Sequence, residues 1–495
     1  MKTHVLIMAI ALMTILPFSQ SVAQTSYSSK REILSGINSA QELSCEFLSR
    51  YIVSHSQSNS SFIQHYFTIQ DMDTTFIRIS RFSLNLGSNP GGNSILPAVK
   101  FVVHDMKVSD NGICYFCGTR KKEYYMCNQP DDSIGFIGMF PLDDFWNSTG
   151  TCKILLINGT SKLTRIEPRG SYEQVFAVGL TNSVGINPIK TNLISCLVGL
   201  GYDYSTSDWY YDIVIPQSST EQFTDVANSG HGIITSSRYI GDNYHIGLRH
   251  VKNGPLSSGV YTSMLNNCNK YDMQTATTGG NVVACRKDND PILLSSQNEY
   301  VTMAHSCYNV ANGIATYLLQ AVNNGNAQLV DAQYTSAPSY VSLKDIAVCI
   351  DGLKSFFLTT DNTGTSHISQ TDWSTTGTYI YSEIPVNSTD IACMRLERFF
   401  RNSWEYYYIG GLTSSSQPAF YAQRLFLFAS NSFFVISCLP SSSNKSFIPL
   451  QTPIYTSTSP GLIEIVCQIN HQLVTDTTSH SFTSTSVTPN TTCNH

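Results

Sequence analysis

Short runs of alternating apolar and polar residues, separated by turn-forming residues, recur along most of this chain. Such runs predict β-strands, because successive side chains of a strand point to opposite faces of its sheet. Helical periodicity is nearly absent, and the best candidate for a helix is the short stretch Ser39–Ser54. The pattern therefore predicts an all-β protein.

Several of these strands share a second feature, an acidic or hydroxyl residue that is followed seven positions later by a glycine and another apolar run. The pairs are Asp105 with Gly112, Asp225 with Gly232, Ser306 with Gly313, and Asp345 with Gly352. Glycine readily adopts the positive φ of a tight hairpin, so we expect these glycines in the turns that join the first two strands of a repeated unit. Weaker copies begin near Ile166–Glu167 and Glu397. Hairpin units recurring at intervals of about 40–60 residues are typical of a β-propeller.

Other apolar runs between the hairpins supply the four antiparallel strands that each propeller blade contains. Counting the units predicts seven blades, within a range of six to eight. We expect residues 60–473 to form the propeller. We also expect Phe62–Phe82 to pair with Gly461–Leu473, because an open ring would leave strand edges exposed. The alternative is a pair of β-sandwich domains, which do not require a phrase that recurs at blade intervals.

The two ends of the chain have distinctive compositions. Lys2, the apolar stretch Val5–Pro17 and the small residues Ser21–Ala23 predict a secretory signal peptide over residues 1–23. Residues 24–59 follow as an N-terminal segment with the possible short helix. Residues 474–495 are rich in Ser and Thr with few apolar residues, which predicts a disordered tail. With no apolar stretch long enough for a transmembrane segment in the mature chain, we expect an extracytoplasmic protein that is periplasmic, on the cell surface or secreted.

Charge and cysteine content narrow the functional classes. Charged residues make up 13% of the chain and the net charge of −6 includes no basic cluster, so nucleic acid is not an expected partner. The 14 cysteines permit complete pairing in an oxidising compartment, but the sequence does not predict which of them pair. Cys114 and Cys117 lie in one predicted strand, where positions three apart face opposite sides. We therefore expect buried residues or structural disulfides there, and no cofactor or metal site.

The phrase from Ser109 to Tyr115, Ser-Asp-Asn-Gly-Ile-Cys-Tyr, partly resembles the aspartate-box turn of sialidase-like propellers. It departs from that pattern because Ser109 and Asp110 are adjacent, and no other repeat restores it. More generally, residues 60–475 resemble secreted bacterial β-propeller proteins of unknown function, whose units begin with Asp, turn at Asp or Asn followed by Gly, and end in an aromatic residue and Gly. The resemblance implies a fold and an extracytoplasmic setting, and it supplies no catalytic residues.

The candidate binding residues are the recurring aspartates, which we expect near the central channel, and three members of aromatic clusters. They are Asp105, Asp225, Asp345, Trp209, Trp404 and Tyr407. Carboxylates that converge could bind a polar ligand, although a repeated Asp at a strand start is also expected to accept hydrogen bonds from backbone N–H groups. Aromatic faces stack on sugars or anchor protein partners. No motif assigns a catalytic residue.

We therefore expect a non-enzymatic propeller that binds a protein or glycan partner, on the cell envelope or outside the cell, through its loop face. The alternative is a carbohydrate-active propeller enzyme, which would require acidic residues in the central funnel.

Overall fold

The computed structural model describes residues 29–33, 44–47, 51–57, 63–71, 78–89, 96–124, 132–143, 150–157, 160–169, 174–182, 194–216, 218, 220–253, 265–274, 277–278, 281–282, 290–308, 312–322, 326–336, 341–348, 354–362, 366–373, 380–386, 391–401, 404–413, 419–427, 443–446, 448–449, 455–457, 470–474, 477–485 and 489–493. The regular elements of this part are all β-strands, and every named pair of neighbouring strands is antiparallel. The prediction of an all-β, antiparallel fold is confirmed.

The largest sheet contains two groups of sequential strands joined through a strand from the C-terminal region. Its order is β2 (Ser44–Phe47), β3 (Tyr51–Gln57), β4 (Gln64–Asp71), β5 (Arg78–Asn85), β35 (Thr477–Thr485), β9 (Thr151–Ile157), β8 (Asp132–Pro141), β7 (Ile113–Glu123) and β6 (Ala98–Val108).

Four further sheets each contain four sequential strands and one short strand from the C-terminal region at the outer edge. The first two are β10 (Thr160–Pro168), β11 (Gln174–Thr181), β12 (Ile194–Asp203), β13 (Asp208–Val214) and β34 (Asn470–Leu473), then β14 (Glu221–Asn228), β15 (Gly232–Tyr239), β16 (Asp242–Asn253), β17 (Leu265–Gln274) and β33 (Tyr455–Ser457). The other two are β20 (Leu293–Gln297), β21 (Tyr300–Cys307), β22 (Gly313–Val322), β23 (Asn326–Ser336) and β32 (Ile448–Pro449), then β24 (Val341–Val348), β25 (Lys354–Asp361), β26 (Ser366–Asp372), β27 (Ile380–Val386) and β31 (Ser443–Ser446).

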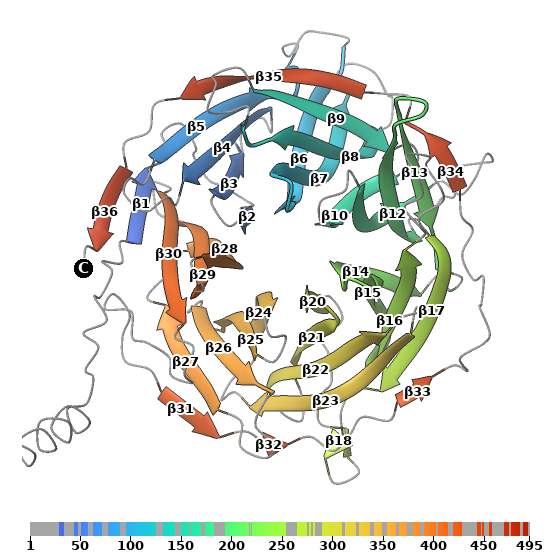
Figure 1. Ribbon diagram of the computed structural model, residues 1–495, viewed down its shortest axis with the longest axis vertical. Helices are drawn as coiled ribbons and strands as arrows, with labels where there is room; N and C mark the ends of the chain where they lie inside the picture. The colour runs from blue at the N-terminus through green and yellow to red at the C-terminus, as the bar shows by residue number, and fades with distance from the viewer. Residues whose placement is uncertain are drawn as a thin grey trace, which may run out of the picture.

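The last five-stranded sheet combines both ends of the described chain. Its order is β28 (Ile391–Arg401), β29 (Trp404–Thr413), β30 (Ala419–Leu427), β1 (Ser29–Ile33) and β36 (Pro489–Cys493). A small hairpin, β18 (Thr277–Thr278) with β19 (Asn281–Val282), stands apart from these sheets. Figure 1 shows the sheets arranged around a common centre, with β2, β6, β10, β14, β20, β24 and β28 on the inner side.

The C-terminal strands β31 to β36, here called the belt, follow one another along the outside of this arrangement (Figure 1). Successive belt strands pair with sheets that come progressively earlier in the chain. Strand β31 pairs with β27, β32 with β23, β33 with β17, β34 with β13, β35 with β9 and β5, and β36 with β1. The expectation of a disordered tail over residues 474–495 is therefore wrong, because β35 and β36 lie there. Its polar residues suit a strand that pairs by main-chain hydrogen bonds and leaves its side chains at the surface.

The expected closure also differs from the observed one. Strand β5, which overlaps the end of the predicted segment Phe62–Phe82, pairs with β35 instead of Gly461–Leu473. The described part of Gly461–Leu473 is strand β34, and it pairs with β13. Closure between the N- and C-terminal regions instead includes β1, which lies between β30 and β36.

The predicted helix over Ser39–Ser54 is wrong for the residues that the structure describes. Ser44–Phe47 and the start of β3 form an antiparallel pair. Val53, His55 and Gln57 alternate along β3 and are all buried, which is the two-residue period of a strand. Strands β1, β2 and β3 precede residue 60, while the predicted signal peptide lies outside the described residues.

The core lies between neighbouring sheets, and strand β7 shows how one strand serves two layers. Cys114 and Phe116 pack into a cluster with β3, β4 and β5, whereas Tyr115 and Cys117 pack into the cluster shared with β10 to β13. Residues on both faces of β7 are apolar because both faces are covered. Cys114 and Cys117 therefore face opposite sides, as their spacing predicts. Burial also raises the pKa of the Cys196 thiol to about 12.

The repeated pairs of the sequence occupy two different places. Asp105 and Asp225 lie on the first strands β6 and β14, with Gly112 in the following turn at φ 75° and Gly232 beginning β15. Ser306 instead lies on β21, the second strand of its sheet. The expectation that all four pairs mark the first hairpin is wrong for this one. Gly352 lies outside the described residues.

Candidate functional site

Four first strands carry a register irregularity at the same place relative to the repeated residue. The pairing shifts just before Asp105 in β6, Arg165 in β10, Asp225 in β14 and Asp345 in β24. A β-bulge inserts one residue that the partner strand does not match, which re-aims the side chains that follow it. The four side chains therefore occupy corresponding positions on four sheets.

Two of the aspartates connect their own sheet to the next one. Asp105 Oδ2 accepts a hydrogen bond from the backbone N–H of Ile166 at 3.0 Å, and Asp225 Oδ2 accepts one from Leu294 at 2.7 Å. In each case the donor belongs to the first strand of the following sheet. Charge-assisted hydrogen bonds of this kind are stronger than neutral ones, so both carboxylates hold neighbouring sheets together.

The aspartates also accept hydrogen bonds from their own strands. Asp225 Oδ1 accepts one from the N–H of Val226 at 2.9 Å, and Asp345 Oδ1 accepts one from Ile346 at 3.0 Å. These are bonds from backbone N–H groups, as expected, and their donors are the next residues of the same strands. All three aspartates are buried, and main-chain donors stabilise their charge there.

Ser306, like Asp105 and Asp225, accepts a hydrogen bond from a main-chain N–H of the next sheet. Its Oγ accepts a hydrogen bond from Leu343 N–H at 2.7 Å, two residues before Asp345. Ser195 Oγ bonds Phe223 N–H at 2.7 Å in the same relation to Asp225. Side chains of one sheet thus satisfy main-chain donors beside the bulges of the next.

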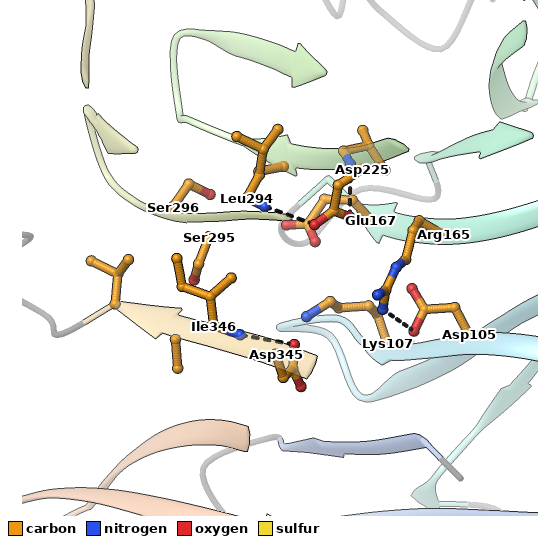
Figure 2. Close-up of a pocket in the computed structure, with 14 residues that line it drawn as sticks. Asp105, Lys107, Arg165, Glu167, Asp225, Leu294, Ser295, Ser296, Asp345 and Ile346 are labelled. Atoms are coloured by element: carbon orange, nitrogen blue, oxygen red, sulfur yellow. Dashed lines mark hydrogen bonds and ion pairs between the residues drawn. The ribbon is translucent and has the colours of Figure 1, made fainter. Parts of the chain in front are cut away.

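Arg165 breaks the acidic pattern at the equivalent position of β10. Its Nη1 lies 3.8 Å from Asp105 Oδ1, and its side chain is 17% exposed. In the view of Figure 2, Arg165 extends between Asp105 and Asp225. The 60-residue steps from 105 to 165 to 225 were the available signal for Arg165 in the sequence, where only its neighbours Ile166 and Glu167 were noted.

These side chains line a cavity of about 130 Å³ formed by five first strands. Its lining residues include Asp105, Lys107, Arg165, Glu167, Asp225, Ser295, Ser296 and Asp345. The three predicted aspartates therefore meet in one pocket, as Figure 2 shows. Sequence reasoning missed Lys107 because no repeat marks it.

Burial raises the pKa of Asp225 to about 6, against the opposing effects of Arg165 and the N–H groups of Leu294 and Val226. The nearby charge of Asp105 raises it further. Asp225 therefore changes charge in mildly acidic solution.

This shift predicts a pH dependence of stability that Asp225→Asn removes. The folded-state pKa lies above the unfolded value, so the folded chain binds the extra proton and its stability falls as pH rises from about 4 to about 6. The free energy of unfolding of the parent relative to Asp225→Asn should decrease by about 2–3 kcal/mol across that window. Urea unfolding of both proteins at a series of pH values measures this difference. A constant difference would contradict the prediction, and the exposed Asp208→Asn is the control.

The predicted aromatic binders have different outcomes. Trp209 is 8% exposed and packs in the cluster between β7–β9 and β10–β13. Its ring contacts Tyr202, and Lys153 lies over it at 5.8 Å. Trp209 is therefore a core residue and does not form the exposed binding surface that the sequence suggested. Trp404 and Tyr407 lie on β29, but their side chains are outside the described residues.

The chain matches no protein-family model and no curated protein. The described residues contain no helix that is long and apolar enough to cross a membrane. Among them there is also no group of three or more His, Cys, Asp or Glu side chains arranged to hold a metal ion. The pocket is accordingly interpreted from its own chemistry.

Proposed function

We propose that this chain is an exported seven-bladed β-propeller that binds a protein or glycan partner and does not catalyse a reaction. The strand order supports the architecture, because seven groups of four antiparallel strands can be followed within the described residues. They are β2–β5, β6–β9, β10–β13, β14–β17, β20–β23, β24–β27, and β28–β30 with β1. The predicted signal peptide supports export to the periplasm, the cell surface or the medium.

One observation carries the non-catalytic assignment. The recurring carboxylates at the centre of the ring accept hydrogen bonds from main-chain N–H groups, and two of these bonds join adjacent sheets. A pair of acids that hydrolyses a glycoside needs carboxyl groups directed at a substrate in separate acid and base or nucleophile roles. Here the same main-chain contact recurs at equivalent strands, which is what a shared scaffold requires.

A carbohydrate-active enzyme is the second candidate, and the ionisation of Asp225 favours it. A buried carboxylic acid with a pKa of about 6 is suited to donate a proton near neutral pH. Asp105 lies in the same pocket. In this alternative Asp225 is the acid and Asp105 the second carboxyl group.

A hydrolysis screen separates the two candidates. The purified chain is incubated with a panel of aryl glycosides, and we expect no release of the chromophore above a protein-free control. Asp105→Ala should instead lower the free energy of unfolding by about 1–3 kcal/mol, because it leaves the buried N–H of Ile166 without its carboxylate acceptor. Hydrolysis by the parent that disappears in Asp225→Asn, with an unchanged melting temperature, would overturn the non-catalytic assignment.

Partner binding is tested by affinity capture from the native cell envelope, followed by titration of the purified chain with the purified candidate. Direct, saturable binding supports the proposed function. Absence of any protein or glycan that binds the purified chain directly counts against it.

A further inference from the structure

Polar side chains interrupt the apolar cluster where strands β2–β5 face strands β6–β9, a region here called the seam. His55 on β3 is 1% exposed, and Gln57 on the same strand and His65 on β4 are fully buried. His55 Nε2 and His65 Nδ1 lie 3.1 Å apart, and the two imidazole rings stack with their centroids 5.3 Å apart. The seam thus contains a hydrogen-bonded pair of titratable rings inside an apolar core.

The hydrogen bond of this pair requires uncharged rings. A neutral imidazole has one N–H donor and one acceptor nitrogen, so one ring donates to the other. When both rings are protonated, neither nitrogen can accept and two like charges are buried together. Burial lowers the pKa of His55 well below its ordinary value, and the neighbouring His65 lowers it further. The folded seam therefore keeps His55 neutral at pH values at which the unfolded chain protonates it.

The charged and titratable groups around the pair do not reverse this effect. By alternation along their strands, the positions that share its face and carry such groups are Glu46, His65, Asp71, Arg78, Cys114, Arg120, Lys122, Asp132, Cys152 and His480. Strand β6 contributes Phe101, Val103 and Met106, which do not ionise. With all these groups in place the pKa of His55 is still lowered, so burial outweighs any attraction from the carboxylates.

Gln57 connects the two halves of the seam on the same face of β3. Its Oε1 accepts a hydrogen bond from the N–H of Val103 at 3.1 Å, beside the bulge that precedes Asp105. Among the described residues, its buried Nε2 has no hydrogen-bond acceptor. A buried donor without an acceptor reduces stability. The polar contact between β3 and β6 is therefore only partly satisfied, two residues from His55.

Phe67 is the second connection across the seam, and it contacts the His pair directly. Its ring lies 4.8 Å from that of His55 between centroids. It also lies 5.2 Å from Phe116, 5.0 Å from Phe140 and 5.7 Å from Phe482. A charge on His55 would therefore arise beside the ring that joins β4 to β7, β8 and the belt strand β35.

The belt carries a second histidine at this seam. His480 lies on β35, two residues before Phe482, and its main chain pairs with Cys152 of β9. Its Nε2 lies 3.2 Å from the hydroxyl of Thr478. Partial burial lowers the pKa of His480, against an opposing hydrogen bond from the main chain of Asn85. Acidification therefore opposes closure of the seam at two places, its interior and the strand that joins β5 to β9.

We propose that the seam is an acid-sensitive latch, in which protonation of the His55–His65 pair separates β2–β5 from β6–β9 and loosens β35 while the other sheets stay folded. Buried histidines that gain charge in mildly acidic solution can bias such a local opening. The latch is independent of whether the ring binds a partner.

The direction of the pH effect follows from proton linkage. The folded-state pKa of His55 lies below that of the unfolded chain, so the open form binds more protons below about pH 6.5. The closed seam is therefore stable above that pH and becomes less stable as pH falls. Its opening constant should rise by up to about tenfold per pH unit for one such histidine. Asp225 acts in the opposite direction, because its extra proton is bound by the folded form.

Hydrogen–deuterium exchange followed by mass spectrometry, at about pH 7.5 and about pH 5.5 with correction for intrinsic exchange rates, tests the latch. In the parent, amides of β3, β4 and β35 should lose protection about tenfold at the lower pH, whereas amides of β21 and β22 should keep theirs. His55→Gln cannot take up the proton and should remove most of this loss in β3 and β4. His231→Gln, in the turn between β14 and β15, is the control and should behave like the parent.

Unchanged protection of β3 and β4 in the parent, the same loss in His55→Gln, or an equal loss in β21 and β22 would each overturn the latch. The exchange pattern of the parent alone distinguishes local opening from global unfolding, so the test does not depend on the folding of a variant. Circular dichroism at the higher pH shows whether His55→Gln is folded before its exchange is compared.

Discussion

Arg249→Met is expected to lower the free energy of unfolding by about 3–5 kcal/mol, because it leaves the Glu221 carboxylate buried without its cation. Arg249 is 2% exposed and Glu221 is fully buried. Arg249 Nη2 lies 2.5 Å from Glu221 Oε2, and its Nε donates to Oε1 at 2.8 Å. Ser237 donates a further hydrogen bond to Oε1 at 2.9 Å, which cannot replace the lost charge. Chemical denaturation at pH 7 measures the effect.

The double variant Glu221→Gln with Arg249→Met is the matched control. It removes both charges and retains a side chain of similar size that Ser237 can still contact. Replacing a buried ion pair by neutral groups is often close to neutral in free energy, so most of the lost stability should return. A single variant that loses less than about 1 kcal/mol, or a double variant no more stable than the single, would show that the ion pair is not a main determinant of this core.

Apolar runs were sufficient to predict strands such as β7, because both of its faces pack against apolar neighbours. The recurring Asp and Gly placed Asp105 with its turn correctly, since glycine tolerates the observed positive φ at Gly112. The same signal misplaced Ser306. Ser306 has the same spacing to a following glycine as Asp105, but it lies on the second strand of its sheet instead of the first. Spacing along the chain therefore does not reveal which strand of a sheet a residue occupies.

The candidate site was predictable only in part. Convergence of Asp105, Asp225 and Asp345 follows from their place on repeated strands. The hydrogen bonds of Asp105 to Ile166 and of Asp225 to Leu294 depend on the bulges and on how adjacent sheets face each other. The amino-acid composition of a single strand reveals neither of these features. Trp209 was predicted to bind a partner but lies in the core. The sequence alone does not distinguish an aromatic side chain that packs between sheets from one that binds a partner.

The sequence did not predict the strands of the belt, because their side chains do not show the pattern of a buried strand. An outermost strand contributes main-chain hydrogen bonds to the sheet while its side chains remain largely at the surface, so it needs no apolar alternation. Strand β35 consists mainly of Ser and Thr, and Phe482 is its only large apolar residue. Such a composition is also that of a disordered segment, so the sequence alone favours the wrong interpretation.

Termination of the chain after Val474 should have the largest effect of all, a loss of at least about 4 kcal/mol that brings a domain of ordinary stability close to unfolding. It removes β36 and the strand that joins β5 to β9. It also removes Phe482, whose ring lies 5.1 Å from Phe140, 5.7 Å from Phe67 and 6.4 Å from Phe82 between centroids. The loss of these aromatic contacts adds to the exposure of three strand edges, those of β5, β9 and β1.

Point variants and a rescue experiment resolve the two contributions. Phe482→Ala should lower the free energy of unfolding by about 2–3 kcal/mol, somewhat less than a fully buried Phe because this ring is only partly buried. Thr483→Ala, at the exposed neighbouring position of the same strand, should change it by less than about 0.5 kcal/mol. A synthetic peptide of residues 475–495 added to the truncated chain should raise its melting temperature in a concentration-dependent way, because a segment that binds only the folded form stabilises it by mass action. A truncated chain that melts like the parent would show that β35 is dispensable. Equal effects of Phe482→Ala and Thr483→Ala would show that the ring does not anchor the belt.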